Sequence, residues 1–457
     1  MHNLPDNPLP PYWLSYESGL SQHRTTPELP SEADVVIIGS GYSGAAAAYH
    51  ILEKDDGRRP SVVVLEARDT CSGATGRNGG HLKPASYSLA SYNEKTYGTK
   101  MARRLLKYEF DQVWDVKRLV EKESIDCDFV LTRGMDVYTD PEVAKTVLAT
   151  FESLKRDGFE FPDDLYVVTD PAKAEQISGV KGTLLLFSFT AGSVWPYKLV
   201  SHLWRRCLEW RANLQTFTPV LSMDKSPNSD GRWILKTPRG TIAAKKVLLA
   251  TNAYTSNLLS DMENKITPVK GVACRIAVSN QGKVAPHLNN TYSIRFGPQE
   301  YDYLIPRTDG SIIVGGAKQV VLRDDDNWLG NANDSQMVAG AEAYFDNYMQ
   351  RIFSGWEESG ATVTDIWTGI MGYAADLKPY VGEVPNKPGL FISAGFTGHG
   401  MPQILGCSTA VASLIRGDIP SLEATNLPRP YWITQERLQS EANLVREYMA
   451  GSRPSRS

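Results

Sequence analysis

Residues 33–52 read ADVVIIGSGYSGAAAAYHIL, and this stretch decides the fold. The apolar run over residues 33–38 is typical of a strand buried on both faces of a parallel sheet. The alanine-rich run over residues 45–52 is good helix material. A second apolar segment, residues 61–66, follows after a charged turn. The pattern predicts a strand–helix–strand unit.

The turn between the first strand and the helix has the spacing GxGxxG, with Gly39, Gly41 and Gly44. Glycines let the backbone approach a pyrophosphate, and the N-terminus of the helix carries a partial positive charge. Glu66 ends the second strand, where a carboxylate can accept hydrogen bonds from ribose hydroxyls and would repel a 2′-phosphate. The three features together favour a dinucleotide site over a tight turn beside a surface glutamate.

Two further segments suit a bound cofactor. Residues 72–81 read SGATGRNGGH, which is poor helix or strand material and could wrap around a ligand or form a mobile surface loop. Its position directly after Glu66 favours the cofactor. Residues 389–402 read GLFISAGFTGHGMP, a strand that leads through glycines to Pro402 at the first position of a helix. This helix N-terminus could face the negative charge of a reduced flavin, or it could be an ordinary cap. Residues 246–254, KVLLATNAY, predict a core strand.

Charge and cysteine usage narrow the class of protein. The chain has 457 residues with 48 basic and 52 acidic side chains, a net charge of −4, which excludes a general binder of nucleic acids or anionic membranes. The five cysteines have no CxxC spacing, so neither a disulfide scaffold nor a metal site is expected. There is no signal pattern at the N-terminus and no apolar run of membrane-spanning length. We therefore expect a cytoplasmic protein with reduced thiols.

The four segments, in this order, resemble the D-amino-acid-oxidase-like superfamily of FAD-dependent oxidoreductases, of the glycine and sarcosine oxidase type. The resemblance extends over about residues 32–420, and the loop that contains GRNGG, residues 76–80, is similar to that of the gamma-glutamylputrescine oxidase branch. It implies bound FAD and an α/β fold. A Rossmann-like domain with a central parallel sheet would be interleaved with a substrate domain on a mixed or antiparallel sheet.

The resemblance also implies which residues hold the FAD. They are Gly39, Gly41, Tyr42, Ser43, Gly44, Glu66, Ala67, Arg68, Ser72, Thr75, Gly76, Arg77, Asn78, Gly79, Gly80, Val220, Ala250, Thr251, Gly398, His399, Gly400 and Met401.

The expected organisation follows from these segments and from helical patterns over residues 92–123, 334–356 and 402–415. The boundaries are an N-terminal arm, residues 1–31; an FAD-binding domain, residues 32–91, 197–261 and 363–425; a substrate domain, residues 92–196 and 262–362; and a C-terminal tail, residues 426–457.

The chain departs from the sarcosine-oxidase pattern at four places. Residues 365–371 contain no cysteine, so we expect no cysteinyl flavin bond, and His81 is the alternative residue for a covalent link. His81 and Pro402 stand where those relatives clamp a substrate carboxylate, which disfavours a small glycine-like substrate. Residues 311–314 lack the lysine that activates oxygen in those relatives, and Lys270 or Lys318 could replace it.

The chemistry that the resemblance implies is the oxidation of a C–N bond by hydride transfer to flavin N5, which gives an imine. O2 would be the electron acceptor and H2O2 the product. The candidate substrate contacts are His81, Tyr303, Trp367 and Tyr373. The expected partners are a small-molecule amine substrate and O2 or another electron acceptor, and the expected assembly is a monomer or homodimer.

Other functions stay open. A dehydrogenase or a biosynthetic flavoenzyme with a different electron acceptor is the alternative. An aromatic hydroxylase would carry a Gly-Asp pair that ATNAYTSNLL lacks, and an NAD-dependent dehydrogenase would need neither glycine-rich loop. A flavin-binding protein without activity is compatible with the sequence, because fold analogy alone does not establish turnover.

Overall fold

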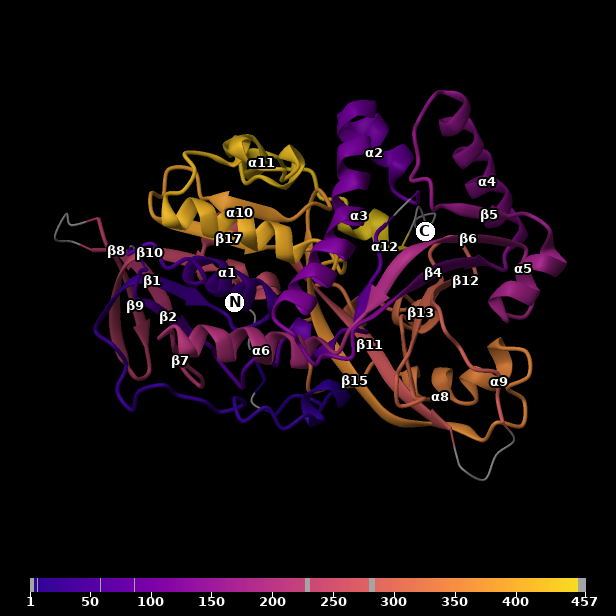
Figure 1. Ribbon diagram of the computed structural model, residues 1–457, viewed down its shortest axis with the longest axis horizontal. Coiled ribbons are helices and arrows are strands. Elements are labelled where there is room, and N and C mark those ends of the chain that lie inside the picture. Colours follow the sequence, from indigo (N-terminus) through magenta and orange to yellow (C-terminus); the bar gives the residue numbers. More distant parts are fainter. Residues whose placement is uncertain are drawn as a thin grey trace.

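The computed structural model describes residues 4–5, 7–57, 59–85, 87–226, 231–278 and 284–450. Two sheets lie side by side, each with helices packed against it (Figure 1). The strand order of the first sheet is β16 (Tyr380–Glu383), β17 (Leu390–Ala394), β10 (Gly240–Leu249), β1 (Glu32–Ile38), β2 (Val62–Leu65) and β7 (Asn213–Gln215), with β9 (Trp233–Thr237) and β8 (Ser222–Lys225) attached beside β10.

The centre of the first sheet is parallel and buried on both faces, as the sequence predicts. β1 pairs in parallel with β2 and β10, and β10 with β17. Val35 and Ile37 pack into a core shared with α1 (Tyr42–Leu52), α6 (Pro196–Glu209) and α10 (Ile404–Arg416). Val36 and Ile38 point to the opposite face and a second core. Because each successive side chain faces the other way, burial on both faces requires the unbroken apolar run.

The second sheet is mixed. Its strand order is β15 (Ala361–Ala374), β11 (Ile266–Val278), β14 (Ile312–Gly315), β13 (Tyr301–Pro306), β12 (Thr291–Arg295), β4 (Val130–Tyr138), β6 (Leu185–Ser193) and β3 (His81–Leu82), with β5 (Tyr166–Val168) beside β6. β12 and β4 pair in parallel, whereas the long strands β11 and β15 pair antiparallel along their whole length. An apolar core lies between this sheet and its helices.

The remaining α-helices are α2 (Ala90–Tyr97), α3 (Thr99–Lys122), α4 (Pro141–Arg156), α5 (Pro171–Ser178), α7 (Lys318–Val321), α8 (Ala341–Phe345), α9 (Tyr348–Ile352), α11 (Gln435–Gln439) and α12 (Val445–Ala450). Within the described ranges, no helix combines the length and the apolar composition that crossing a bilayer requires.

Three expected helices differ in their limits. Gly98, at φ 79°, separates α2 from α3 within the single helix expected over residues 92–123. The helix expected over residues 334–356 is instead the two short helices α8 and α9, because Gly340 and Asn347 adopt left-handed backbone conformations at their starts. α10 begins at Ile404, so Pro402 lies in the preceding turn and not at the first helical position.

The expected α/β architecture, with a parallel and a mixed sheet interleaved in sequence, is confirmed. Strands of the first sheet come from residues 32–65, 213–249 and 380–394, and the segments between them build the second sheet. Two details differ from the expected organisation. β3 lies in residues 32–91, which were expected in the FAD-binding domain, but it pairs within the second sheet. β15 also pairs within the second sheet along its whole length, so the domain boundary expected before residue 363 falls inside this strand.

Candidate active site

A cavity of about 450 Å³ lies between the two sheets. The first sheet contributes the segments that follow the carboxyl ends of β1, β2 and β10, and the second sheet contributes residues of β11, β13 and β15. The carboxyl edge of a parallel sheet is where ligands bind in folds of this kind, because the chain there turns into helix N-termini and loops. The sequence motifs described above converge on this edge.

The N-terminus of α1 opens toward the cavity, with residues 39–43 in its lining. Gly39 has φ +106°, and a Cβ on it would lie 2.6 Å from the carbonyl oxygen of Ala250. The amide of Tyr42 donates to Thr75 Oγ1 at 3.1 Å, which links the helix to the loop over residues 72–81. Gly44 does not line the cavity; a Cβ on it would overlap the carbonyl oxygen of Gly39, so it permits close packing of α1 on β1.

Glu66 follows β2 and lines the cavity beside Ala67 and Val220. Its Oε2 accepts hydrogen bonds from the amide and the hydroxyl of Ser40, at 2.9 and 2.6 Å. Its Oε1 accepts from the amide of Arg68 at 3.0 Å. These bonds fix the orientation of the carboxylate, which retains lone pairs for a ligand hydroxyl.

The loop over residues 72–81 is held in place by buried side chains. Arg77 donates to the carbonyl oxygens of Ser72, Leu9 and Thr368 at 2.8–2.9 Å. Burial lowers the pKa of Arg77 to about 10, although the nearby carboxylate of Asp334 favours its charge. The guanidinium lines the cavity, but its donors bond mainly to the protein, so it organises the loop.

Besides Gly44, three residues expected at the cofactor or substrate do not line the cavity. A Cβ on Gly76 would overlap the carbonyl oxygen of Cys71, and one on Gly80 that of Val194, so these glycines let the loop pack tightly. Trp367 was expected as a substrate contact, but its side chain is fully buried in the core. Its indole N–H donates to the carbonyl oxygen of Arg77 at 2.8 Å, so Trp367 positions the loop without itself lining the cavity.

The other three substrate-contact candidates, His81, Tyr303 and Tyr373, all line the cavity. Burial, with the nearby Lys83 and His399, holds the pKa of His81 well below its ordinary value, so the ring is neutral at pH 7. The ring of Tyr303 fits against Gly79 and Gly315, where any Cβ would overlap it. Burial raises the pKa of both tyrosines, so their hydroxyls stay protonated.

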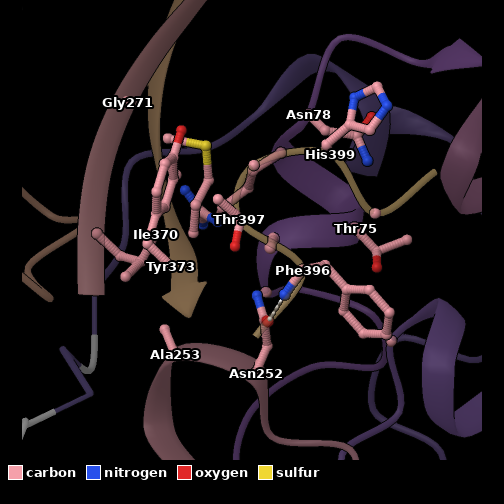
Figure 2. Close-up of a pocket in the computed structure, with 18 of the residues that line it drawn as sticks. Thr75, Asn78, Asn252, Ala253, Gly271, Ile370, Tyr373, Phe396, Thr397 and His399 are labelled. Carbon is pink, nitrogen blue, oxygen red and sulfur yellow. Dashed lines mark hydrogen bonds between the residues drawn. The ribbon is translucent and has the colours of Figure 1, made fainter. Parts of the chain in front are cut away.

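The glycine-rich turn over residues 395–400 crosses the cavity wall. Figure 2 shows Thr397 between Tyr373 on one side and His399 with Asn78 on the other. His399 Nε2 lies 2.9 Å from the carboxylate of Glu109, which also accepts from Gln403 Nε2 at 2.7 Å. Burial raises the pKa of Glu109, but His399 and the hydrogen bonds to the carboxylate outweigh it and lower the pKa to about 2.

Several cavity residues were not predicted from the sequence. Asn252 Oδ1 accepts from the amides of Gly395 and Phe396 at 3.0 and 3.4 Å, and thereby ties the central strand to the last motif (Figure 2). Lys378 lines the cavity and donates to Asn93 Oδ1 at 2.8 Å. Tyr448 comes from α12 in the C-terminal tail. Of these residues only Asn252 could have been recognised in the sequence, because it follows a predicted strand that leads into the site. Lys378 and Tyr448 reach the cavity through tertiary packing.

The residues present fit FAD. Ser72 Oγ and His81 Nε2 are buried in the cavity wall without a hydrogen-bond partner in the described part of the chain. Buried polar atoms are normally paired, so these two indicate a ligand or water in contact with them. The α1 N-terminus suits a pyrophosphate and Glu66 suits a ribose. Both lie in the same cavity as the aromatic residues, as an elongated dinucleotide requires.

Comparisons with known proteins agree with this assignment. Residues 34–414 match the family model described as DAO, FAD dependent oxidoreductase. The chain is 25% identical over 427 residues to the probable oxidoreductase OrdL of Rhizobium meliloti (strain 1021), with 91% of each chain covered. It is 23% identical to the gamma-glutamylputrescine oxidoreductase of Escherichia coli (strain K12), with 86% of each covered. Glycine oxidase from Geobacillus kaustophilus has a similar fold, with TM-score 0.68, 20% identity, and 89% of this chain and 99% of that one covered.

Proposed function

Because the chain belongs to the DAO family of FAD dependent oxidoreductases, we propose that it oxidises a C–N bond of an amine or an N-substituted amino acid. When bound, FAD supplies the hydride acceptor for the C–H bond next to the nitrogen, so that the substrate becomes an imine, which water hydrolyses. The names of the relatives support an amine substrate, since they include a gamma-glutamylputrescine oxidoreductase and a glycine oxidase. The observation that carries the proposal is a single cavity that joins the dinucleotide-binding residues to His81, Tyr303 and Tyr373.

The chain's residues divide into binding and substrate-facing groups in this proposal. The amides at the start of α1 hold the pyrophosphate, Glu66 holds the adenosine ribose, and the loop over residues 72–81 runs along the cofactor. Gly398, His399, Gly400 and Met401 would hold the flavin at its pyrimidine edge. The helix that follows them begins only at Ile404, so amides of this glycine-rich turn, rather than a helix end, would be the donors there.

The cavity walls control the protonation state of the substrate. Hydride loss requires the lone pair of a neutral amine, and desolvation disfavours the ammonium form. The uncharged rings of half-buried His81 and Tyr303 and of buried Tyr373 provide such a setting without a dedicated base. His81 Nε2, which has no partner in the described chain, is the atom we assign to hydrogen bonding with the substrate nitrogen.

We assign O2 as the electron acceptor and H2O2 as the product. Lys270, a buried cation in the cavity wall, supports this assignment. Its Nζ donates to the carbonyl oxygen of Gln336 at 3.2 Å, and burial lowers its pKa. A positive charge at this place can stabilise the negative charge that forms on oxygen as it is reduced.

The test is to mix the purified, yellow protein anaerobically with amines and N-methyl amino acids and to record the visible spectrum. Bleaching of the flavin band by one class of compound is the expected result. Recovery of the band on admission of air, with H2O2 formed, identifies an oxidase; bleaching that persists in air identifies a dehydrogenase. A flavin that no amine bleaches would contradict the proposed substrate class.

We also propose that the FAD is bound without a covalent link. None of the five cysteines, all within the described ranges, lines the cavity. Acid precipitation is therefore expected to leave the flavin in the supernatant. Flavin that stays with the pellet would contradict the proposal, and loss of that retained flavin in His81→Ala would identify His81 as the attachment residue.

A further inference from the structure

Two basic side chains of the cavity wall lie close to one tyrosine ring. Arg295 ends β12 and pairs directly with Tyr301 of β13 in the strand register. Its guanidinium carbon lies 4.2 Å from the centroid of the Tyr301 ring. Lys318, the first residue of α7, has its Nζ 5.3 Å from the same centroid. All three residues line the cavity.

Neither cation has an acidic partner among the described residues. Lys318 is 7% exposed, and its Nζ donates only to the thioether sulfur of Met449, at 3.0 Å, which is a weak acceptor. The Nε of Arg295 is buried without a hydrogen-bond partner.

The neighbouring carboxylates are already engaged. Asp136 lies 2.6 Å from Lys83 Nζ and accepts from the hydroxyl of Tyr87 at 2.9 Å. Asp302 accepts from Tyr344, Tyr348 and the amide of Ala317. Asp136 acts on Arg295 only through space and helps to raise its pKa, and no carboxylate of the described residues forms an ion pair with Arg295 or Lys318.

Such an arrangement is costly unless an anion completes it. Burying a charge without an ion-pair partner is unfavourable, and two cations close together repel each other. Burial together with the charge of Arg295 lowers the pKa of Lys318 to about 7. An anion between the two side chains would remove both penalties and return the pKa of Lys318 toward its ordinary value.

We propose that Arg295 and Lys318 form a subsite for a carboxylate of the substrate, at a distance from the nitrogen where the substrate is oxidised. The proposal rests on the proposed amine oxidation. The N-substituted amino acids of that proposal carry such a carboxylate.

The strand geometry places this subsite away from the reacting end. Tyr301 and Tyr303 are two residues apart and point to the same face of β13. Tyr303 fits against Gly79 of the loop over residues 72–81. Two residues of a strand span roughly 7 Å. The carboxylate is therefore separated from the oxidised C–N bond by several bonds, and N-methylglycine is too short to reach both places.

The test uses ω-(methylamino)alkanoic acids of two to six carbons, each paired with its carboxamide. Kd is measured from the visible spectrum of the flavin, and flavin reduction is followed anaerobically. We expect the longer acids to bind at least tenfold more tightly than their amides. Arg295→Gln and Lys318→Met, which remove charged hydrogen-bond donors, are each expected to reduce that preference by about 10- to 100-fold. Arg323→Gln, an exposed arginine near Lys318, is the matched control and should leave the preference unchanged.

Equal binding of acid and amide, or a preference that both variants keep, would overturn the subsite. So would the absence of binding by every acid, or tighter binding of an aminoalkylphosphonate of the same length. Flavin reduction by the amides without any advantage for the acids would leave the proposed amine oxidation intact. Failure of acids, amides and simple amines alike to reduce the flavin would contradict the proposed function itself. Flavin content is measured for each variant, and Lys318→Met decides the matter if Arg295→Gln loses its FAD.

Discussion

At the scale of single residues, two carboxylates hold their places in the cavity wall by very different means. Glu66 is fixed by two amides and a hydroxyl from neighbouring loops. Glu109 comes from the middle of α3 and is held by His399, Gln403 and the amide of Ala85. Both carboxylates are oriented by hydrogen bonds within the protein, so side-chain entropy is lost on folding and not on binding a ligand.

Glu66→Ala is expected to strip the cofactor. The substitution removes the acceptor for the ribose hydroxyls and leaves the amides of Ser40 and Arg68 without their partner. Hydrogen bonds to a charged group contribute about 1.5–3 kcal/mol each, so the Kd for FAD should rise at least tenfold. The flavin-to-protein absorbance ratio after gel filtration measures this. Glu142→Ala, an exposed glutamate, is the control, and an unchanged ratio in Glu66→Ala would show that Glu66 does not hold the cofactor.

Glu109 should make the stability of the protein depend on acid pH. Its pKa is lowered from 4.5 to about 2, so its stabilising contribution is complete above pH 4.5 and is lost as the pH falls toward 2. A shift of this size corresponds to about 3 kcal/mol. Urea unfolding at pH 7 and pH 3, with saturating FAD, should show a smaller loss of stability in Glu109→Gln than in the wild type. Glu121→Gln on the same helix should behave like the wild type, and identical losses in all three proteins would contradict the prediction.

At the scale of elements, the nucleotide end of the cavity depends on how closely α1 approaches β1. Gly44 lies in the first turn of α1, directly over the carbonyl oxygen of Gly39. The far side of α1 packs on α6 and α10 in one apolar core, so the helix cannot move outward without disturbing that core. The position of the α1 amides is therefore set by packing on both sides of the helix.

Gly44→Ala is expected to displace α1 and weaken both stability and FAD binding. The added methyl group overlaps the Gly39 carbonyl oxygen, and overpacking of this kind costs about 1–3 kcal/mol. Thermal unfolding and an FAD titration of the apoprotein measure the two effects. In Gly297→Ala the nearest atom lies 3.4 Å from the new Cβ, so that variant should match the wild type. Normal FAD affinity in Gly44→Ala would show that the contact is not needed.

At the scale of the whole molecule, one buried carboxylate joins the two halves. Asp334 lies in the segment between β14 and β15 of the second sheet and makes two bonds of 3.0 Å with Arg68, which follows β2 of the first sheet. Arg77 lies 3.3 Å from the same carboxylate, and the carbonyl oxygen of Asp334 accepts from the amide of Leu9 in the N-terminal arm. The N-terminal arm, the loop over residues 72–81 and the segment between β14 and β15 thus meet at Asp334.

Asp334→Asn should destabilise the protein by about 3–5 kcal/mol, because it leaves two buried guanidinium groups without their anion. FAD should also dissociate faster, since Arg77 organises the loop over residues 72–81. Denaturant unfolding and the rate of flavin release give the two readouts. The control is Asp326→Asn, an exposed aspartate of the same segment. Wild-type stability of Asp334→Asn would show that the carboxylate is not what joins the halves.

The sequence by itself determined the βαβ unit at the start of the chain, the α/β class and part of the cavity lining. These features are local: a strand buried on both faces, a glycine turn and an acidic residue at the end of the next strand need no distant partner to be recognised. The residues Gly39, Glu66 and Thr75 accordingly lie in the cavity where the motifs placed them.

Only the tertiary structure decided the rest of the cavity. Trp367 and Tyr373 lie on the same strand, yet the first is buried behind the loop and the second faces the cavity. Arg295 faces the cavity because its strand pairs in one register with β13, and Glu109 because α3 packs against α10. Which side chain faces a cavity depends on strand register and on packing between segments far apart in the sequence, and a shift of β12 by one residue would turn Arg295 to the other face of the sheet.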